Sequence, residues 1–171
     1  MRILILSDIH GIPSMLERAL KAGEALGYDR IAMLGDFLYH GPRNGVPSIY
    51  DPEKVIDILN GLKDKIIAVR GNCDCEVDQA VLQFPMMADY SLLEADGETF
   101  FLTHGHYWNA IHLPPIGMAT VLMHGHTHMP EDRMLECGVR IFNPGSVSLP
   151  RGGSQHSFGY WDGKELKHYV I

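Results

Sequence analysis

The chain has 171 residues, of which 46% are apolar and 20% charged, with a formal net charge of −7 at pH 7. This composition is that of an ordinary globular protein, and the length predicts a single domain over residues 1–171 with a substantial core. The 14 Lys and Arg residues are scattered without a basic run, which argues against a nucleic-acid partner because phosphate polymers bind clustered cations.

The first half of the chain alternates between predicted strands and helices. Apolar residues repeat at helical spacing from Ser14 to Leu26, and Gly27 provides a stop signal. Asp51-Pro52 is a typical helix start, with an N-cap followed by proline at the first position. Continuous aliphatic runs are typical of strands buried on both faces of a parallel sheet. These runs lie at residues 3–6, 31–34 and 66–69.

The second half consists of paired extended stretches. Asp96-Gly97 and Asp162-Gly163 each separate two such stretches, and both dipeptides favour the positive φ of a hairpin turn. Cys137-Gly138 predicts a third hairpin, and we expect the hairpins to form a second sheet. The resulting prediction is an α/β fold, a four-layer α/β/β/α sandwich of two mixed sheets flanked by helices.

Hydrophobicity and cysteine content predict the location. No segment approaches the roughly 18 apolar residues of a membrane span, and the apolar run before Asp8 is too short for a signal peptide. The three cysteines are an odd number without Cys-x-x-Cys spacing, so neither a disulfide framework nor structural zinc is expected. A reducing cytoplasm and no membrane partner are therefore predicted.

Five of the apolar runs end in a turn of small residues that carries potential metal ligands. One such turn alone is more often an ordinary loop with a surface histidine. The set is different, because two His-x-His pairs that each close an apolar strand are hard to explain by packing. The five turns are Asp8-Ile9-His10, Gly35-Asp36, Gly71-Asn72, His104-Gly105-His106 and Gly125-His126-Thr127-His128.

Two carboxylates, one amide and four or five imidazoles are too many ligands for one ion. They suit two divalent ions that share a bridging carboxylate, a centre that hydrolyses phosphate esters. Asp36 is the natural bridge, because a carboxylate can bind both ions whereas an imidazole nitrogen binds one. Asn72 would be a weak neutral ligand that leaves its ion Lewis-acidic.

The charge of such a centre favours an anionic substrate. Two divalent ions carry four positive charges, Asp8 and Asp36 carry two negative charges and a bridging hydroxide carries one, so about one positive charge remains. A bound metal also lowers the pKa of its water from about 15.7 to about 7, which supplies a nucleophile without a Ser or Cys side chain.

The segment from Asp36 to Tyr50 is rich in Gly and Pro, and a loop of this length is usually functional. For His40, on this loop, a role in facing the substrate and a role in bracing the loop are equally open. Arg43 is expected to help choose between diester and monoester substrates. The candidate substrate-binding residues are His40, Arg43, Asn44 and His106.

The five turns match, in order, the motifs of the calcineurin-like metallophosphoesterases, which the chain therefore resembles. Further segments resemble the bacterial YfcE-type phosphodiesterases more closely: residues 40–44, 69–74, 76–79, 143–148 and 150–153. The resemblance covers Met1 to about Gly153.

This resemblance implies a ligand set and a mechanism. It implies Mn²⁺ as the activating ion, with Zn²⁺, Fe, Mg²⁺, Ni²⁺ or Co²⁺ as alternatives, and in-line attack by the bridging hydroxide. The implied ligands are Asp8, His10 and His128 for the first ion, Asn72, His104 and His126 for the second, and Asp36 as the bridge.

Cys73 departs from the wider superfamily pattern. Many members carry Gly-Asn-His-Asp, whose His stands beside the leaving group as an acid or charge stabiliser. A neutral thiol is a poor proton donor to an alkoxide, so good leaving groups are expected unless His106, His40 or a metal-bound water supplies the proton. The candidate catalytic residues are Asp36, Asn72, Cys73 and His104.

The function predicted from these motifs is a metal-dependent phosphodiesterase acting on small phosphate esters. A phosphomonoesterase using the same centre is the nearest alternative. A non-catalytic scaffold, like the retromer subunit that resembles this fold, is the alternative from another class; a scaffold need not keep every ligand, whereas all seven are present here. Apolar residues from Trp108 to Met118 favour a homodimer or higher homo-oligomer.

Overall fold

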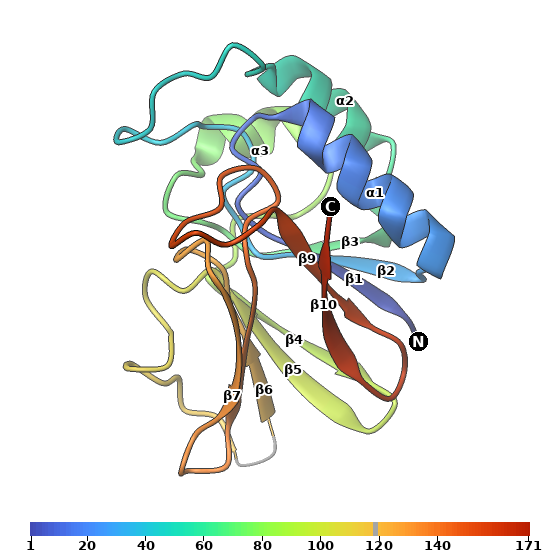
Figure 1. Ribbon diagram of the computed structural model, residues 1–171, viewed down its shortest axis with the longest axis vertical. Helices are drawn as coiled ribbons and strands as arrows, with labels where there is room; N and C mark the ends of the chain where they lie inside the picture. The colour runs from blue at the N-terminus through green and yellow to red at the C-terminus, as the bar shows by residue number, and fades with distance from the viewer. Residues whose placement is uncertain (118–119) are drawn as a thin grey trace.

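The computed structural model describes residues 1–117 and 120–171, in which two five-stranded sheets pack face to face (Figure 1). The first sheet has the order β10-β9-β1-β2-β3 and the second has the order β4-β5-β6-β8-β7. The strands of the first sheet are β1 (Ile3–Leu6), β2 (Arg30–Met33), β3 (Ile66–Ala68), β9 (Ser157–Trp161) and β10 (Leu166–Val170). Those of the second are β4 (Tyr90–Ala95), β5 (Glu98–Thr103), β6 (Thr120–Met123), β7 (Pro130–Met134) and β8 (Arg140–Pro144).

The first sheet contains the predicted parallel strands and a hairpin that was expected elsewhere. β1, β2 and β3 are parallel, with Ile3 opposite Arg30. The hairpin of β9 and β10 was predicted to join the second sheet, and this was wrong, because β9 pairs antiparallel with β1. All five residues of β9 are buried, which suits an inner strand that is covered on both faces. A hairpin pattern fixes which two strands pair but not which sheet they join.

The second sheet is mixed. The hairpin of β4 and β5 has the predicted bounds, and β7 and β8 form the hairpin predicted around Gly138. β6 lies between β5 and β8 and is parallel to both. The carboxyl ends of β5 and β6 therefore lie at one edge of this sheet, as those of β1 to β3 do in the first sheet.

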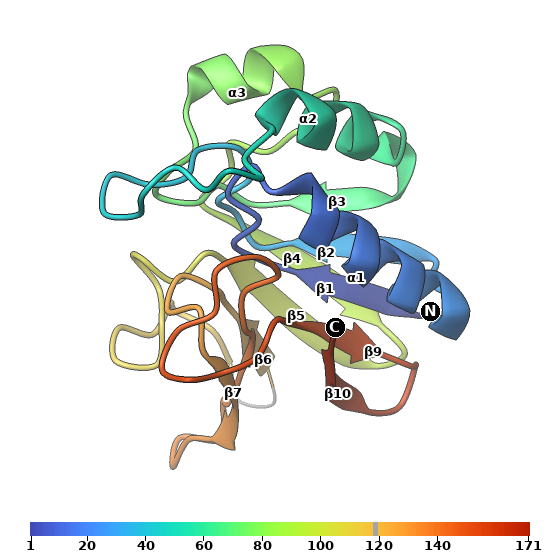
Figure 2. The same cartoon turned by 45° about the horizontal axis from the view of Figure 1, so that its top comes forward.

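The helices cover the outer face of the first sheet (Figures 1 and 2). They are α1 (Pro13–Leu26), α2 (Pro52–Asn60) and α3 (Glu76–Val81), with a 3₁₀ turn η1 (Lys63–Lys65). α2 begins as predicted, since the Asp51 side chain accepts a hydrogen bond from the Lys54 backbone N–H at 3.0 Å. α3 has only six residues, too few for an apolar repeat, and the sequence did not indicate it.

The outer face of the second sheet has a different cover. Within residues 105–117 no helix forms, and Trp108, Leu113 and Ile116 pack on the outer face of the second sheet instead. Pro114-Pro115 explains this, because proline cannot donate the backbone hydrogen bonds of a helix. Two mixed sheets with helices are thus confirmed, while the fourth layer is irregular in the described part of the chain. Met118, the last residue of the apolar segment predicted to favour a dimer, lies outside the described residues.

Alternate residues of β1 serve two cores. Leu4 and Leu6 pack under the helices, while Ile3 and Ile5 pack against the second sheet. All four are fully buried, which explains why the strand is apolar throughout. None of the described helices is both long enough and apolar enough to span a membrane.

Candidate metal centre

The five predicted turns come together at the carboxyl ends of the strands. The Asp8 N–H donates to the Gly35 carbonyl at 3.1 Å, and the His10 N–H donates to the Asp36 carbonyl at 3.0 Å. In the second sheet the Gly125 N–H donates to the His104 carbonyl at 2.8 Å. Backbone hydrogen bonds therefore hold these turns against one another.

Most of the described non-glycine residues with positive φ belong to these turns. A left-handed backbone costs about 1–3 kcal/mol per residue and persists only where its surroundings enforce it, which is common at functional sites. One of the six, Asp96, lies in a hairpin turn. The other five are Asp8 (57°), His10 (51°), Asp36 (58°), His126 (68°) and His128 (61°).

Three imidazoles are oriented by backbone carbonyls. A carbonyl oxygen can only accept, so the Nδ1 of each ring carries the hydrogen and the Nε2 faces the centre. The pairs are His10 Nδ1 with Tyr39 O at 2.7 Å, His104 Nδ1 with Leu34 O at 2.7 Å and His128 Nδ1 with Leu149 O at 2.5 Å. This is the usual way to fix a metal-binding tautomer.

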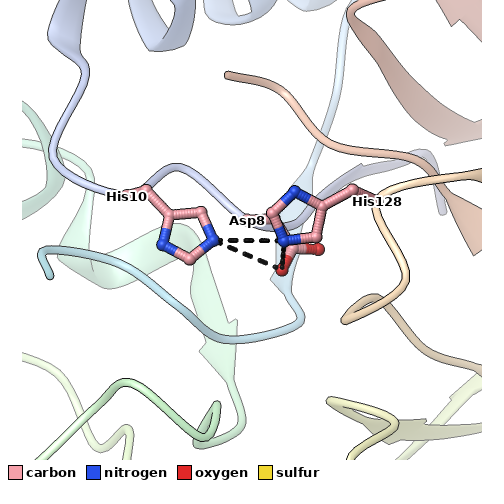
Figure 3. A group of neighbouring side chains, drawn as sticks. All are labelled: Asp8, His10 and His128. Atoms are coloured by element: carbon pink, nitrogen blue, oxygen red, sulfur yellow. Dashed lines mark hydrogen bonds and ion pairs between the residues drawn. The ribbon is translucent and has the colours of Figure 1, made fainter. Parts of the chain in front are cut away.

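The first group of ligand atoms comes from Asp8, His10 and His128 (Figure 3). The Nε2 atoms of His10 and His128 are 3.3 Å apart, and Asp8 Oδ1 lies 3.3 Å from the second and 3.7 Å from the first. Asp8 Oδ1 is fully buried and has no hydrogen-bond partner among the described residues. Facing lone pairs beside an unpaired carboxylate oxygen are unfavourable unless a cation lies between them, so these residues fit a divalent ion.

A second group lies beside Asp36. The His104 Nε2 is 3.4 Å from Asp36 Oδ2 and 3.0 Å from Asn72 Oδ1. The His126 ring lies 5.1 Å from the His104 ring. Asp36 Oδ2 is also 3.6 Å from His10 Nε2 of the first group, so one carboxylate oxygen lies near ligand atoms of both groups.

The pKa shifts show how strongly these groups interact. Burial opposes ionisation of Asp36, but the hydrogen bond and charge of His104, the Cys73 backbone N–H and the charge of His10 together outweigh it and hold the pKa of Asp36 well below its usual value. Burial likewise opposes the charge on His104, yet Asp36 and Asp8 raise its pKa to about 9. Burial and the charge on His104 lower the pKa of His126 to about 4. Without a metal, the site therefore holds ionised carboxylates and a protonated His104 at neutral pH.

Asp74 was not predicted as a site residue. It is buried and accepts three backbone hydrogen bonds, from Asp36 and Gly71 on Oδ2 and from Phe37 on Oδ1, at 2.7–2.8 Å. Burial and the neighbouring Asp36 raise its pKa to about 6. Asp74 thus binds the turn after β2 to the turn after β3. Its only sequence signal is its place two residues after Asn72.

A cavity of about 270 Å³ opens beside these ligands. Arg43, Asn44 and Cys73 line it, as expected of substrate-facing residues, and so does Arg151, which was not predicted to do so. The lining also includes His10, Asp36, Asn72, His126 and His128.

His40 and His106 lie outside this lining. The His40 ring packs between Tyr39 and Tyr50, with centroid distances of 4.6 and 5.3 Å, which favours the role in bracing the loop. The His106 ring lies 5.4 Å from the His104 ring, on the side of the second group.

Cys73 holds a neutral thiol at the cavity wall. Burial and the nearby Asp36 raise the pKa of its thiol to about 12. Its backbone N–H donates to Asp36 Oδ1 at 2.8 Å, and its Sγ accepts from the Asn72 amide at 3.2 Å. The thiolate is therefore not accessible near neutral pH.

Comparison with known proteins places this site in context. A family model described as the calcineurin-like phosphoesterase superfamily domain matches residues 1–165. Phosphodiesterase YfcE of Escherichia coli (strain K12) is 43% identical over 166 residues, which cover 97% of this chain and 90% of that protein. The solved structure of the phosphoesterase Yfce from E. coli has a TM-score of 0.90 and 44% identity, covering 94% of this chain and 87% of that one.

A more distant likeness concerns the fold alone. The structure of Vps29 from Entamoeba histolytica, complexed with zinc, has a TM-score of 0.61 at 20% identity and covers 99% of this chain and 91% of that one.

Proposed function

The chain belongs to the calcineurin-like phosphoesterase superfamily and is a metal-dependent phosphoesterase, and from this premise we propose that it is a phosphodiesterase of small phosphate esters with a dinuclear centre. The preference for diesters follows the name of the 43% identical relative. That relative also disfavours a non-catalytic scaffold, since the Vps29 likeness is limited to the fold.

The observation that carries the proposal is the unpaired Asp8 Oδ1, which faces the Nε2 atoms of His10 and His128. We assign these three residues to one ion. When bound, the two ions would supply a bridging hydroxide for in-line attack and would neutralise charge on the phosphoryl oxygens. The second ion is assigned to Asn72, His104 and His126, with Asp36 as the bridge.

The metal preference is proposed from the family resemblance, and the donor set is compatible with it. Four imidazole nitrogens, two carboxylates and one amide suit first-row divalent ions. Mn²⁺ is the proposed ion, with Zn²⁺, Fe, Mg²⁺, Ni²⁺ or Co²⁺ as alternatives.

Cys73 would limit the leaving groups. Its thiol stays neutral at the pH of the reaction, since burial and Asp36 raise its pKa to about 12, and so weak an acid protonates a departing alkoxide poorly. Esters whose leaving group departs as a stable anion should therefore react faster.

Metal content and turnover test this function together. Protein saturated with Mn²⁺ should hold about two ions per chain and hydrolyse bis(p-nitrophenyl) phosphate faster than p-nitrophenyl phosphate. Asp36→Asn and His126→Ala should lower kcat by about 100-fold or more. Asp57→Asn, an exposed carboxylate on α2, is the matched control and should keep full activity. Binding of fewer than two ions with no diester hydrolysis would refute the proposal, and faster monoester hydrolysis would favour the phosphomonoesterase.

The remaining expectations concern the setting. We propose that residues 1–171 act as one domain in the cytoplasm, supported by three free cysteines. A homodimer is proposed through the outer face of the second sheet, where Tyr90 is 52%, Leu92 59% and Ile111 98% exposed. Light scattering of the purified protein would give its mass in solution.

A further inference from the structure

Arg151 lies in the wall of the cavity with Arg43, on a different loop. Its Nη2 donates to Asn44 Oδ1 at 3.4 Å, and the Asn44 amide donates to the His40 carbonyl at 2.7 Å. Arg151 thus connects the loop after β8 to the loop after β2 across the cavity.

The backbone of Arg151 is fixed by a candidate metal ligand. Its N–H donates to the His128 carbonyl at 3.2 Å, and Leu149, two residues earlier, accepts from the His128 ring. Gly152 follows with a φ of 62°, where a Cβ would lie only 2.6 Å from the Met129 sulfur. Glycine adopts this left-handed backbone without strain, and the turn at Gly152 sets where the Arg151 side chain begins.

Within residues 1–117 and 120–171, neither Arg43 nor Arg151 forms an ion pair, and the single side-chain partner of Arg151 is the neutral Asn44. Arg70 and Arg140 differ, because each forms an ion pair: Arg70 with Asp89 at 2.7 Å and Arg140 with Asp132 at 2.8 Å. The two cavity arginines are therefore free to bind an anion.

A simple diester would leave the positive charges of Arg43 and Arg151 uncompensated. Under the proposed function, the ions with Asp8, Asp36 and the hydroxide keep about one positive charge, which one diester phosphate neutralises. Arg43 and Arg151 then leave two further positive charges at the same cavity. A second phosphate group would compensate them through charge-assisted hydrogen bonds.

We propose that Arg43 and Arg151 bind a second phosphate group of the substrate, so that the preferred substrates are phosphodiesters that carry a further phosphate beside the scissile one. This inference rests on the proposed function, because it takes the scissile phosphate to lie at the strand-end ligands. Arg151 is then a specificity residue and not a metal ligand.

The inference is tested by measuring the separate affinities of two anions, one that resembles the product and one that cannot be hydrolysed. Calorimetry on protein kept saturated with Mn²⁺ would compare inorganic phosphate with methylenediphosphonate. The diphosphonate should bind at least about tenfold more tightly, and Arg43→Gln and Arg151→Gln should each weaken it by about tenfold while changing phosphate affinity by less than about twofold. Arg151→Lys should retain part of the preference. Arg18→Gln, which removes the charge of an exposed α1 arginine that hydrogen-bonds the Met15 sulfur, is the matched control.

The inference would be overturned if the glutamine variants lost equal affinity for both anions, or if both variants kept the wild-type affinity for the diphosphonate. Hydrolysis of bis(p-nitrophenyl) phosphate by the same wild-type preparation separates the two claims. Turnover without a diphosphonate preference refutes only the second phosphate site, whereas absent turnover refutes the proposed function and the inference with it.

Discussion

His104 has a buried imidazole with both nitrogens engaged. Nδ1 donates to the Leu34 carbonyl, and Nε2 lies 3.0 Å from Asn72 Oδ1 and 3.4 Å from Asp36 Oδ2. This arrangement suits a protonated ring in the metal-free protein. A metal ion must therefore displace a proton from Nε2 before His104 can bind it.

We expect Mn²⁺ binding at pH 7.5 to release about two protons. One comes from His104, whose pKa is raised to about 9, because ligands must be deprotonated. About one more comes from the water that would become the bridging hydroxide. The sign follows directly: metal affinity rises with pH, and less steeply above about 9, where His104 is already deprotonated. Calorimetry in two buffers of different ionisation enthalpy measures the proton count. His104→Asn should lower the proton count by about one, and a wild-type count no higher than that of the variant would contradict the assignment.

Cys73→His should change which leaving groups are tolerated. An imidazole beside the departing oxygen can donate a proton, which the neutral thiol does poorly, so the rate for alkyl esters should rise by about tenfold or more relative to activated aryl diesters. The ratio of kcat/KM for the two substrate types measures this. Equal ratios in both proteins would show that Cys73 does not govern the leaving group.

Single residues were partly predictable from the sequence. The seven candidate ligands were found because each follows a strand, and parallel strand ends meet at one edge. Asp74 and Arg151 were not assigned roles, because their contacts with Asp36 and Asn44 span 38 and 107 residues. No local pattern reports such contacts.

At the scale of elements, the turns after β2 and β3 are in direct contact. A Cβ on Gly71 would lie 2.0 Å from Asp36 Oδ1 and 2.4 Å from the Asp36 backbone nitrogen. The glycine is therefore required for the approach of one turn to the other, and Asp74 holds that approach from the opposite side.

Gly71→Ala should move the Asp36 carboxylate and weaken metal binding by about 10–100-fold, a size typical of lost ligand positioning. Titration with Mn²⁺ followed by metal analysis measures the affinity. Gly97→Ala is a useful control, since a Cβ there meets no atom within 4 Å although its positive φ will cost some stability. Unchanged Mn²⁺ affinity in Gly71→Ala would show that Asp36 does not depend on this contact.

Elements were predicted best where the signal is local. The strands after which the ligands lie, the start of α2 and the hairpin of β4 and β5 all follow from nearby residues. The sheet to which β9 belongs does not follow from nearby residues, because β9 pairs with β1 from the other end of the chain. Helices were expected on the outer face of the second sheet, but Pro114-Pro115 disfavours a helix there.

At the scale of the whole molecule, Asp96 joins three distant parts. It accepts from the N-terminal ammonium of Met1 at 2.9 Å and from the Trp161 indole at 3.1 Å, and it sits in the turn between β4 and β5. The start of the chain, the second sheet and β9 of the first sheet therefore meet at one carboxylate.

Asp96→Asn should lower the Tm by about 2–4 °C near pH 6, since asparagine keeps the left-handed turn but loses the ion pair. Hydrogen bonding from the N-terminal ammonium lowers the pKa of Asp96. Its stabilisation is therefore present above the ordinary carboxyl pKa and is lost as pH falls through the lower folded value. Thermal melts from pH 6 to pH 2 should converge for the two proteins at the acid end, and parallel curves would show that the charge does not matter.

The carbonyls that orient two of the imidazoles belong to the two loops that carry the arginines. Tyr39 O holds His10 from the loop of Arg43, and Leu149 O holds His128 from the loop of Arg151. An anion that steadies these loops therefore also steadies two of the proposed ligands of one ion. By thermodynamic reciprocity, a bound substrate should raise the affinity for that ion by the same factor by which the bound ion raises the affinity for the substrate. Metal retention and substrate affinity would then be two readings of one coupling free energy.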